Sequence, residues 1–129
     1  MKPYETWLLK AYSDLKSAKK LMEGENKIPD TAIYHAQQSA EKALKAYLSF
    51  KQQPIRKTHD VELLTELCIE LNAEFNAILD DAKELTGYDI AFRYPDIILE
   101  HDEEDVFDAI KKAEKILTFV QDHTQRELQ

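Results

Sequence analysis

The chain has 129 residues, of which 25 are acidic and 17 basic, so its formal net charge is −8. This length suits a single domain, expected over residues 1–129, and the charge argues against a protein wholly devoted to coating nucleic acid. One cysteine excludes an internal disulfide framework, and no apolar run is long enough to span a membrane.

Two amphipathic helices are predicted at the start of the chain. Pro3 opens the first and Gly24 follows it, and apolar side chains recur between them at steps of three and four: Tyr4, Leu8, Ala11, Leu15, Ala18 and Met22. The second begins at Pro29 and ends before Pro54, with an inner seam of Ile33, Ala36, Ala40, Ala43, Tyr47 and Phe50. Because alanines let a neighbouring helix approach closely, the second helix is expected at the centre of the fold.

Three further helices are predicted, each preceded by a residue that can cap it. Thr58 can cap a helix over residues 61–71, and Asn72 can cap the helix that follows it. Asp102 can cap the last helix, whose apolar stripe consists of Val106, Ala109, Ile110, Ala113, Ile116, Leu117 and Val120. Residues 125–129 are expected to fray. No segment alternates with period two, so the predicted fold class is all-α: an antiparallel up-and-down bundle of four to five helices.

A polar stripe follows the second predicted helix on the side away from its seam. His35, Gln38, Lys42, Lys45 and Ser49 fall within a narrow arc and are expected to lie outside the core. The chain from Lys42 to His59 carries five Lys or Arg residues and no acidic one, whereas residues 96–108 carry seven acidic residues. The stripe is either a solvated face or a surface for a phosphate-bearing ligand or an acidic partner.

The segment AFRYPD, residues 91–96, breaks the helical periodicity. Pro95 disfavours the α conformation at Tyr94, so the chain turns and can hold Arg93 and Tyr94 outward. The alternative is a structural turn in which Arg93 pairs with a nearby carboxylate, Asp89 or Asp96. His59 is similarly either a neighbour of a helix cap or a site histidine.

Several common sites are missing from the sequence. Glycine occurs only at 24 and 87, so neither a P-loop nor a dinucleotide fingerprint can form. The four histidines never lie three or four apart, and with one cysteine they offer no structural zinc pattern, so no metal or cofactor is expected. No Gly-x-Ser-x-Gly motif occurs. The N-terminus lacks a signal-peptide pattern, and a cytoplasmic location is therefore expected.

Three motifs in this order, YHAQQSAEKALKAYL from Tyr34, THDVELL from Thr58 and FRYPD from Phe92, resemble the HEPN domain family. The resemblance extends from about Trp7 to Val120 and is closest to compact prokaryotic members encoded beside small nucleotidyltransferases. It implies a helical bundle that forms a homodimer, works with a small nucleotidyltransferase and binds a nucleotide or RNA. It also implies a place in a toxin–antitoxin or related defence pair.

Many members of this family are metal-independent ribonucleases, marked by an arginine, about four to six intervening residues and a histidine. The histidine moves a proton to or from the ribose 2′-hydroxyl, and the arginine stabilises the phosphorane-like charge. Here seven residues separate Arg93 from His101, and two separate Arg56 from His59. The sequence therefore favours a non-catalytic binding module. The alternatives are a ribonuclease that uses Arg93 with a histidine, and a purely structural interaction module.

The candidate site residues combine the stripe, the turn and the histidines. For nucleotide or RNA binding they are His35, Gln38, Lys42, Lys45, His59, Arg93 and Tyr94. For catalysis they are Arg93 and His101, with His35 or His59 as the other histidines that could serve.

Overall fold

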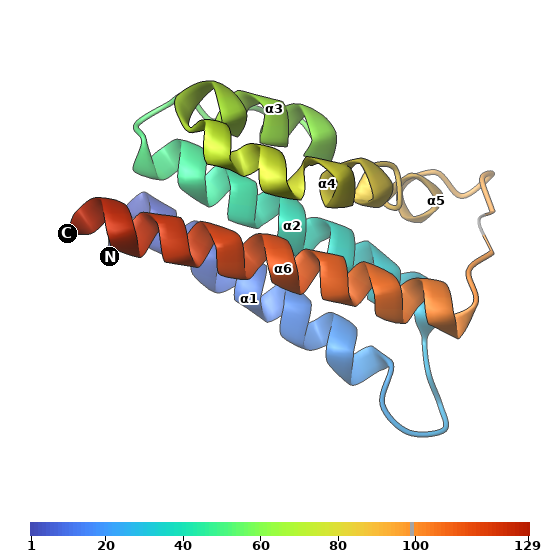
Figure 1. The fold of residues 1–129 in the computed structure, drawn as a ribbon. Coiled ribbons are helices and arrows are strands. Elements are labelled where there is room, and N and C mark those ends of the chain that lie inside the picture. Colours follow the sequence, from blue (N-terminus) through green and yellow to red (C-terminus); the bar gives the residue numbers. More distant parts are fainter. Residues whose placement is uncertain (99) are drawn as a thin grey trace.

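The computed structural model describes residues 1–98 and 100–129, with the backbone but not the side chain of Phe92. Its helices are α1 (Pro3–Leu21), α2 (Pro29–Phe50), α3 (Val61–Leu71), the 3-10 helix η1 (Ala73–Ile78), α4 (Leu79–Leu85), α5 (Ile90–Arg93) and α6 (Glu103–Leu128). α1 and α2 form one antiparallel pair, η1 and α4 fold back along α3, and α6 lies across both groups (Figure 1). The described chain is a helical bundle, as its periodicity predicts.

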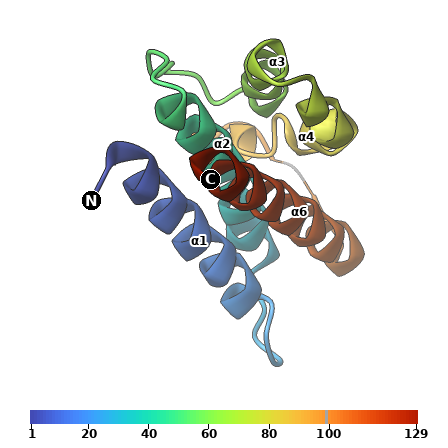
Figure 2. The same cartoon turned by 60° about the vertical axis from the view of Figure 1, so that its left-hand side comes forward.

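α2 lies at the centre of this bundle. It contacts α1, α3, α4 and α6, and Figure 2 shows it between α1 on one side and α3 and α4 on the other. Five of the six residues of the predicted seam are buried, with an exposure of 1% or less at Ile33, Ala36, Ala40, Ala43 and Tyr47, whereas Phe50 at its end is only partly buried. The alanines leave room for the neighbouring backbones, which explains why a helix with so many small residues can be surrounded.

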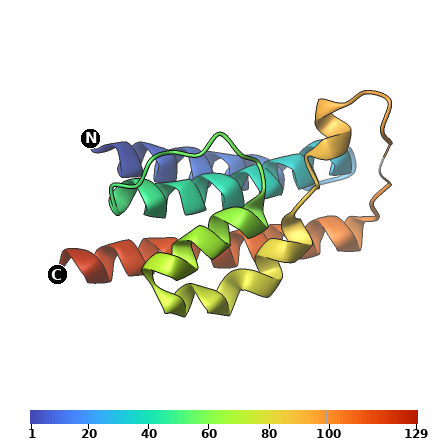
Figure 3. The same cartoon turned by 90° about the horizontal axis from the view of Figure 1, so that it is seen from above.

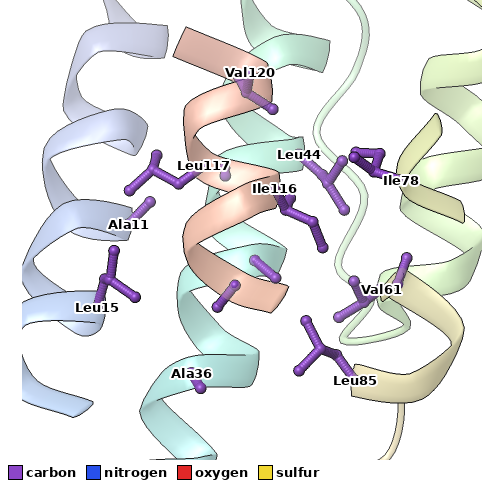
Figure 4. Packing of buried hydrophobic residues seen from close by; sticks show 14 of the residues in the cluster. Ala11, Leu15, Ala36, Leu44, Val61, Ile78, Leu85, Ile116, Leu117 and Val120 are labelled. Atoms are coloured by element: carbon purple, nitrogen blue, oxygen red, sulfur yellow. The ribbon is translucent and has the colours of Figure 1, made fainter. Parts of the chain in front are cut away.

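Side chains from all the long helices meet in one core. Figure 4 shows its apolar members interdigitating, among them Ala11, Leu15, Ala36, Leu44, Val61, Ile78, Leu85, Ile116, Leu117 and Val120. None of these exposes more than 5% of its surface. Because a fully buried Leu, Ile or Val stabilises the fold by about 1.5–3 kcal/mol, this core holds the helices together without a disulfide.

The helix caps agree with the sequence at two of three positions. Asn72 and Asp102 each accept a hydrogen bond from a backbone N–H of the following turn, although Asn72 opens η1 rather than an α-helix. The prediction that Thr58 caps α3 is wrong. Asp60 caps it instead and accepts from the N–H of Leu63 at 3.0 Å, because a cap must lie directly before the first helical residue.

Of the C-terminal residues expected to fray, 125–128 form the last turn of α6. The carboxylate of Glu127 accepts a hydrogen bond from the Tyr47 hydroxyl at 2.8 Å and from Lys51 Nζ at 2.7 Å. These two contacts tie the last turn of α6 to the end of α2, which the local composition could not reveal.

Two non-adjacent segments approach the same face of α2. Residues 51–60 have no helix and run back along α2 to the start of α3, while α5 lies beside the N-terminal half of α2 (Figure 3). His59 and Arg93 are thereby brought to neighbouring positions. Among the described helices, none combines the length and apolarity needed to cross a bilayer.

Candidate functional site

The predicted polar stripe of α2 is divided between two buried carboxylates. The expectation that its members lie outside the core is wrong for Gln38 and Lys45, which expose 6% and 5% of their surface. The reason is that α1 also covers this flank of α2. The ammonium of Lys45 lies 5.7 Å from the centroid of the Trp7 ring, a cation–π contact that encloses the lysine.

Asp14 of α1 holds one half of the stripe. Its carboxylate accepts a hydrogen bond from His35 Nδ1 at 2.8 Å and from Lys42 Nζ at 2.6 Å, and Asp14 is 8% exposed. The sequence did signal this residue, because Asp14 lies three residues after Ala11 and four before Ala18 on the buried face of α1. A carboxylate at such a position needs a cationic partner.

Glu41 of α2 holds the other half. Its Oε1 accepts from His59 Nδ1 at 2.9 Å and its Oε2 from Lys45 Nζ at 3.1 Å. The Glu41 side chain is 4% exposed, the Lys45 side chain 7% and the His59 ring 48%. Glu41 is therefore a buried carboxylate that positions a half-exposed imidazole.

Two glutamines complete the support for His59. Gln37 Nε2 donates to the backbone carbonyl of His59 at 2.9 Å, and Gln38 Nε2 donates to Gln37 Oε1 at 2.8 Å. Gln38 also lies 3.4 Å from Glu41 Oε1. The QQ pair of the YHAQQ motif thus fixes the segment that carries His59, rather than presenting an amide to solvent.

Arg93 reaches the same imidazole from the end of α5. Its Nε donates to Asp89 Oδ2 at 2.5 Å, and its Nη2 lies 3.0 Å from His59 Nδ1. Of the two partners left open by the sequence, Asp89 is the one used, and it is 5% exposed. Partial burial lowers the pKa of the Arg93 guanidinium, but the hydrogen bond and charge of Asp89 outweigh this and raise the pKa above its ordinary value.

We assign the tautomer of His59 from its contact with Glu41. An ionised carboxylate only accepts a hydrogen bond, so the proton is placed on Nδ1, which donates it to Glu41; in this tautomer Arg93 Nη2, 3.0 Å from the same nitrogen, is a close neighbour and not a donor to it. In the neutral ring the lone pair is then on Nε2, which has no hydrogen-bond partner among the residues described. The structure thus pairs an imidazole that can accept a proton with a guanidinium that remains cationic; we call these the His59–Arg93 pair.

The two remaining candidates, Tyr94 and His101, are not part of this pair. Tyr94 is 56% exposed and adopts the extended conformation that Pro95 predicts, with φ −122°. His101 packs edge-to-face on Tyr88, with 5.3 Å between ring centroids, and lines a separate pocket of about 390 Å³. The structure therefore joins Arg93 with His59 and not with His101.

The candidate residues thus fall into three groups. The first group surrounds Glu41 and consists of His59, Arg93, Gln38 and Lys45. The second group meets at Asp14 and consists of His35 and Lys42. The third, Tyr94 and His101, lies on the α5 side and belongs to neither cluster. The contributions of Glu41, Asp14 and Gln37 were missed, because each lies on a helix face next to apolar residues. In the described part of the chain, no three His, Cys, Asp or Glu side chains are grouped so as to hold a metal ion.

Comparison with known proteins agrees with this architecture. The chain is similar to the crystal structure of ST0689, an archaeal HEPN homologue, with a TM-score of 0.75 and 29% identity over 96% of this chain and 99% of that one. It is also similar to TT1696 from Thermus thermophilus, with a TM-score of 0.75 and 26% identity over 95% of this chain and 98% of the other. No curated protein matches the sequence. The family model of the HEPN domain matches residues 4–123, and the chain therefore belongs to the HEPN domain family.

Proposed function

We propose that this HEPN-domain protein binds a phosphate group of a nucleotide or RNA at the His59–Arg93 pair. One observation carries the proposal: a guanidinium and a half-exposed imidazole lie 3.0 Å apart, each attached to a buried carboxylate. Groups fixed in this way are preorganised for a ligand, because little side-chain entropy is lost on binding.

The chemistry of the pair suits a phosphate. Arg93 uses one of its N–H groups on Asp89, and the remaining donors can grip two phosphate oxygens in the planar geometry that guanidinium groups favour. His59 adds a donor from Nε2 when it is protonated. Lys45 balances the charge of Glu41, which reduces the repulsion between that carboxylate and a bound phosphate.

The assembly proposed around this site is a homodimer that works with a small nucleotidyltransferase, in a toxin–antitoxin or defence pair. The family resemblance supports it, and so does the apolar surface beside Arg93. Ile90 is 41% exposed, Tyr94 56% and Ile98 83%, and these side chains offer a second chain an apolar area to bury. Light scattering at micromolar concentration tests the dimer: the expected mass is about twice 15.0 kDa.

Binding is tested by fluorescence anisotropy with a short labelled single-stranded RNA and by competition with ATP. Arg93→Ala should weaken binding by at least about tenfold, since one charge-assisted contact contributes roughly 1.5–3 kcal/mol. Arg126→Ala serves as the control, because it removes an arginine near the end of α6 without touching the pair. Equal affinities for wild type and Arg93→Ala would refute the proposed site.

A metal-independent ribonuclease is the second candidate, and the contact between His59 and Arg93 favours it. Nε2 of neutral His59 would take the proton of a ribose 2′-hydroxyl, whose oxygen attacks phosphorus and expels the 5′-oxygen, while Arg93 stabilises the charge on the phosphoryl oxygens. The leaving oxygen takes up a proton from water, His59 returns its proton to the solvent, and a 2′,3′-cyclic phosphate remains. Chromatography of RNA incubated with wild type and His59→Ala distinguishes the candidates: cyclic phosphate ends formed only by wild type identify the nuclease.

A further inference from the structure

Both ring nitrogens of His123 lie beside hydrogen-bond acceptors. Nδ1 lies 2.8 Å from the backbone carbonyl oxygen of Phe119, one turn earlier in α6, and Nε2 lies 2.9 Å from Oε2 of Glu74 in η1. A neutral imidazole carries one N–H and one bare nitrogen, so it can satisfy only one of these acceptors. Both hydrogen bonds form only when both nitrogens carry hydrogens, and the ring is then a cation.

The other three histidines do not require this charge. His35 and His59 each face one carboxylate, at Nδ1, which the single N–H of a neutral ring satisfies. His101 forms no hydrogen bond with the described residues and packs on Tyr88. Among the histidines that the structure describes, His123 is therefore the one whose contacts distinguish the protonated from the neutral ring.

The surroundings of His123 suit a buried cation. The residue is 4% exposed, and its ring stacks on Phe119 with 4.0 Å between centroids and lies 5.4 Å from the ring of Phe75. Aromatic faces attract a cation, and a buried cation needs a counter-ion, which Glu74 provides. Glu74 reaches this contact from the surface, because 65% of its side chain is exposed.

The nearby charges are balanced when His123 is protonated. The other titratable groups near it come from the end of α2 and from α6: Tyr47, Lys51, Asp122, Arg126 and Glu127. Asp122 and Arg126 are exposed and opposite in sign, and burial raises the pKa of Tyr47, which keeps the phenol neutral. Glu127 pairs with Lys51. The negative charge of Glu74 then has His123 as its partner, and a neutral ring would leave this carboxylate uncompensated.

We propose that protonation of His123 fastens η1 to α6, so that His123, Glu74 and the Phe119 carbonyl form a pH-dependent clasp. A neutral ring must give up one of its two contacts. If Nδ1 keeps the hydrogen, Nε2 has nothing to donate to Glu74. If Nε2 keeps it, the lone pairs of Nδ1 and the Phe119 carbonyl face each other and the ring turns away. Either outcome opens the clasp, and neither involves the phosphate site.

The clasp makes stability fall as the pH rises. Its closure means that the folded protein holds the His123 proton more tightly than the unfolded chain does. The contribution to stability is therefore fully present below about pH 6.5, where histidines of unfolded chains titrate, and is lost as the pH rises through the higher value at which the folded ring deprotonates. The contribution of Glu127 changes in an acidic range, so the two effects can be measured separately.

The test combines nuclear magnetic resonance of the histidine ring nitrogens with urea unfolding at several pH values. Glu74→Gln removes the charge of the side chain and keeps its size. Glu66→Gln is the matched control, because Glu66 is an exposed glutamate of α3 that forms no ion pair with the described residues. His123→Gln removes the ring itself. Since Glu74 lies at the surface, its variant keeps the test decisive even if His123→Gln does not fold.

In wild type, both ring nitrogens of His123 should stay protonated at a pH where the histidines of the urea-unfolded chain are neutral, and Glu74→Gln should abolish this difference. Between about pH 5.5 and about pH 8.5, the unfolding constant of wild type should rise about tenfold more than that of Glu74→Gln or His123→Gln, the size of one charge-assisted hydrogen bond. Glu66→Gln should follow wild type. A His123 ring that titrates as it does in the unfolded chain would overturn the clasp. So would the same pH dependence in wild type and Glu74→Gln, or an equal change in Glu66→Gln.

Discussion

Replacing Glu41 by glutamine should destabilise the fold severely, because Glu41 balances a buried charge. Its carboxylate is 4% exposed and accepts from Lys45 Nζ at 3.1 Å, and the Lys45 side chain is 7% exposed. Glutamine preserves the shape of the side chain but leaves the lysine charge buried without a counter-ion. Breaking a buried ion pair on one side costs about 3–5 kcal/mol, which at about 4 °C per kcal/mol lowers the melting temperature by roughly 12–20 °C.

Urea unfolding followed by circular dichroism measures this loss as a lower midpoint with an unchanged slope. The double variant Glu41→Gln with Lys45→Met should recover most of the stability, because replacing both partners of a buried pair by residues of similar volume is often neutral. A loss below about 1 kcal/mol in the single variant, or no recovery in the double variant, would refute the assignment of a buried Glu41–Lys45 pair.

Three further predictions concern stability and reactivity. Ala40→Leu should destabilise the bundle by about 1–3 kcal/mol in the same urea assay, because Ala40 is fully buried at the centre of α2; unchanged stability would mean that the seam is assigned to the wrong face. Partial burial raises the pKa of Glu127, but hydrogen bonds from Lys51 and Tyr47 outweigh it, so the pKa lies below its ordinary value. The stability that Glu127 contributes is therefore fully present above its unfolded pKa near 4.5 and is lost as the pH falls through its lower folded pKa. Glu127→Gln should consequently have a lower free energy of unfolding than wild type at neutral pH and the same one only at acidic pH. Burial raises the pKa of the Cys68 thiol, so iodoacetamide should label it only in urea.

The helices could be predicted because their signals are local. The step of three and four in α1, the alanine seam of α2 and the caps Asn72 and Asp102 each lie within one or two turns of the residues they order. Where α5 lies, the sequence predicts only a turn, since four residues are too few for a periodic pattern. The return of residues 51–60 along α2 has no sequence signal, because that segment is ordered by contacts with other elements.

The site could be predicted only in part. His59 and Arg93 were both candidates, yet their contact joins residues 34 positions apart, on a non-helical segment and a short helix, where periodicity carries no information. The burial of Gln38 and Lys45 was missed because a helical wheel shows which side of α2 is apolar, but not that α1 covers the polar flank as well. The sequence does place one acidic residue, Glu41, directly beside the cationic stripe. That position is the signal for an ion pair that could bury Lys45.

Nuclear magnetic resonance of labelled protein tests the phosphate site most directly. On titration with ATP, and separately with a short single-stranded RNA, the ring resonances of His59 and the Nε–H resonance of Arg93 should shift and saturate together. His123 is the internal control, because its ring nitrogens lie 2.8 Å from the Phe119 carbonyl and 2.9 Å from the Glu74 carboxylate. It belongs to the C-terminal part of α6, and α6 ends on the side of the bundle opposite α5 (Figure 1). Resonances of His59 and Arg93 that stay unmoved at saturating concentrations of both ligands would contradict the proposed site.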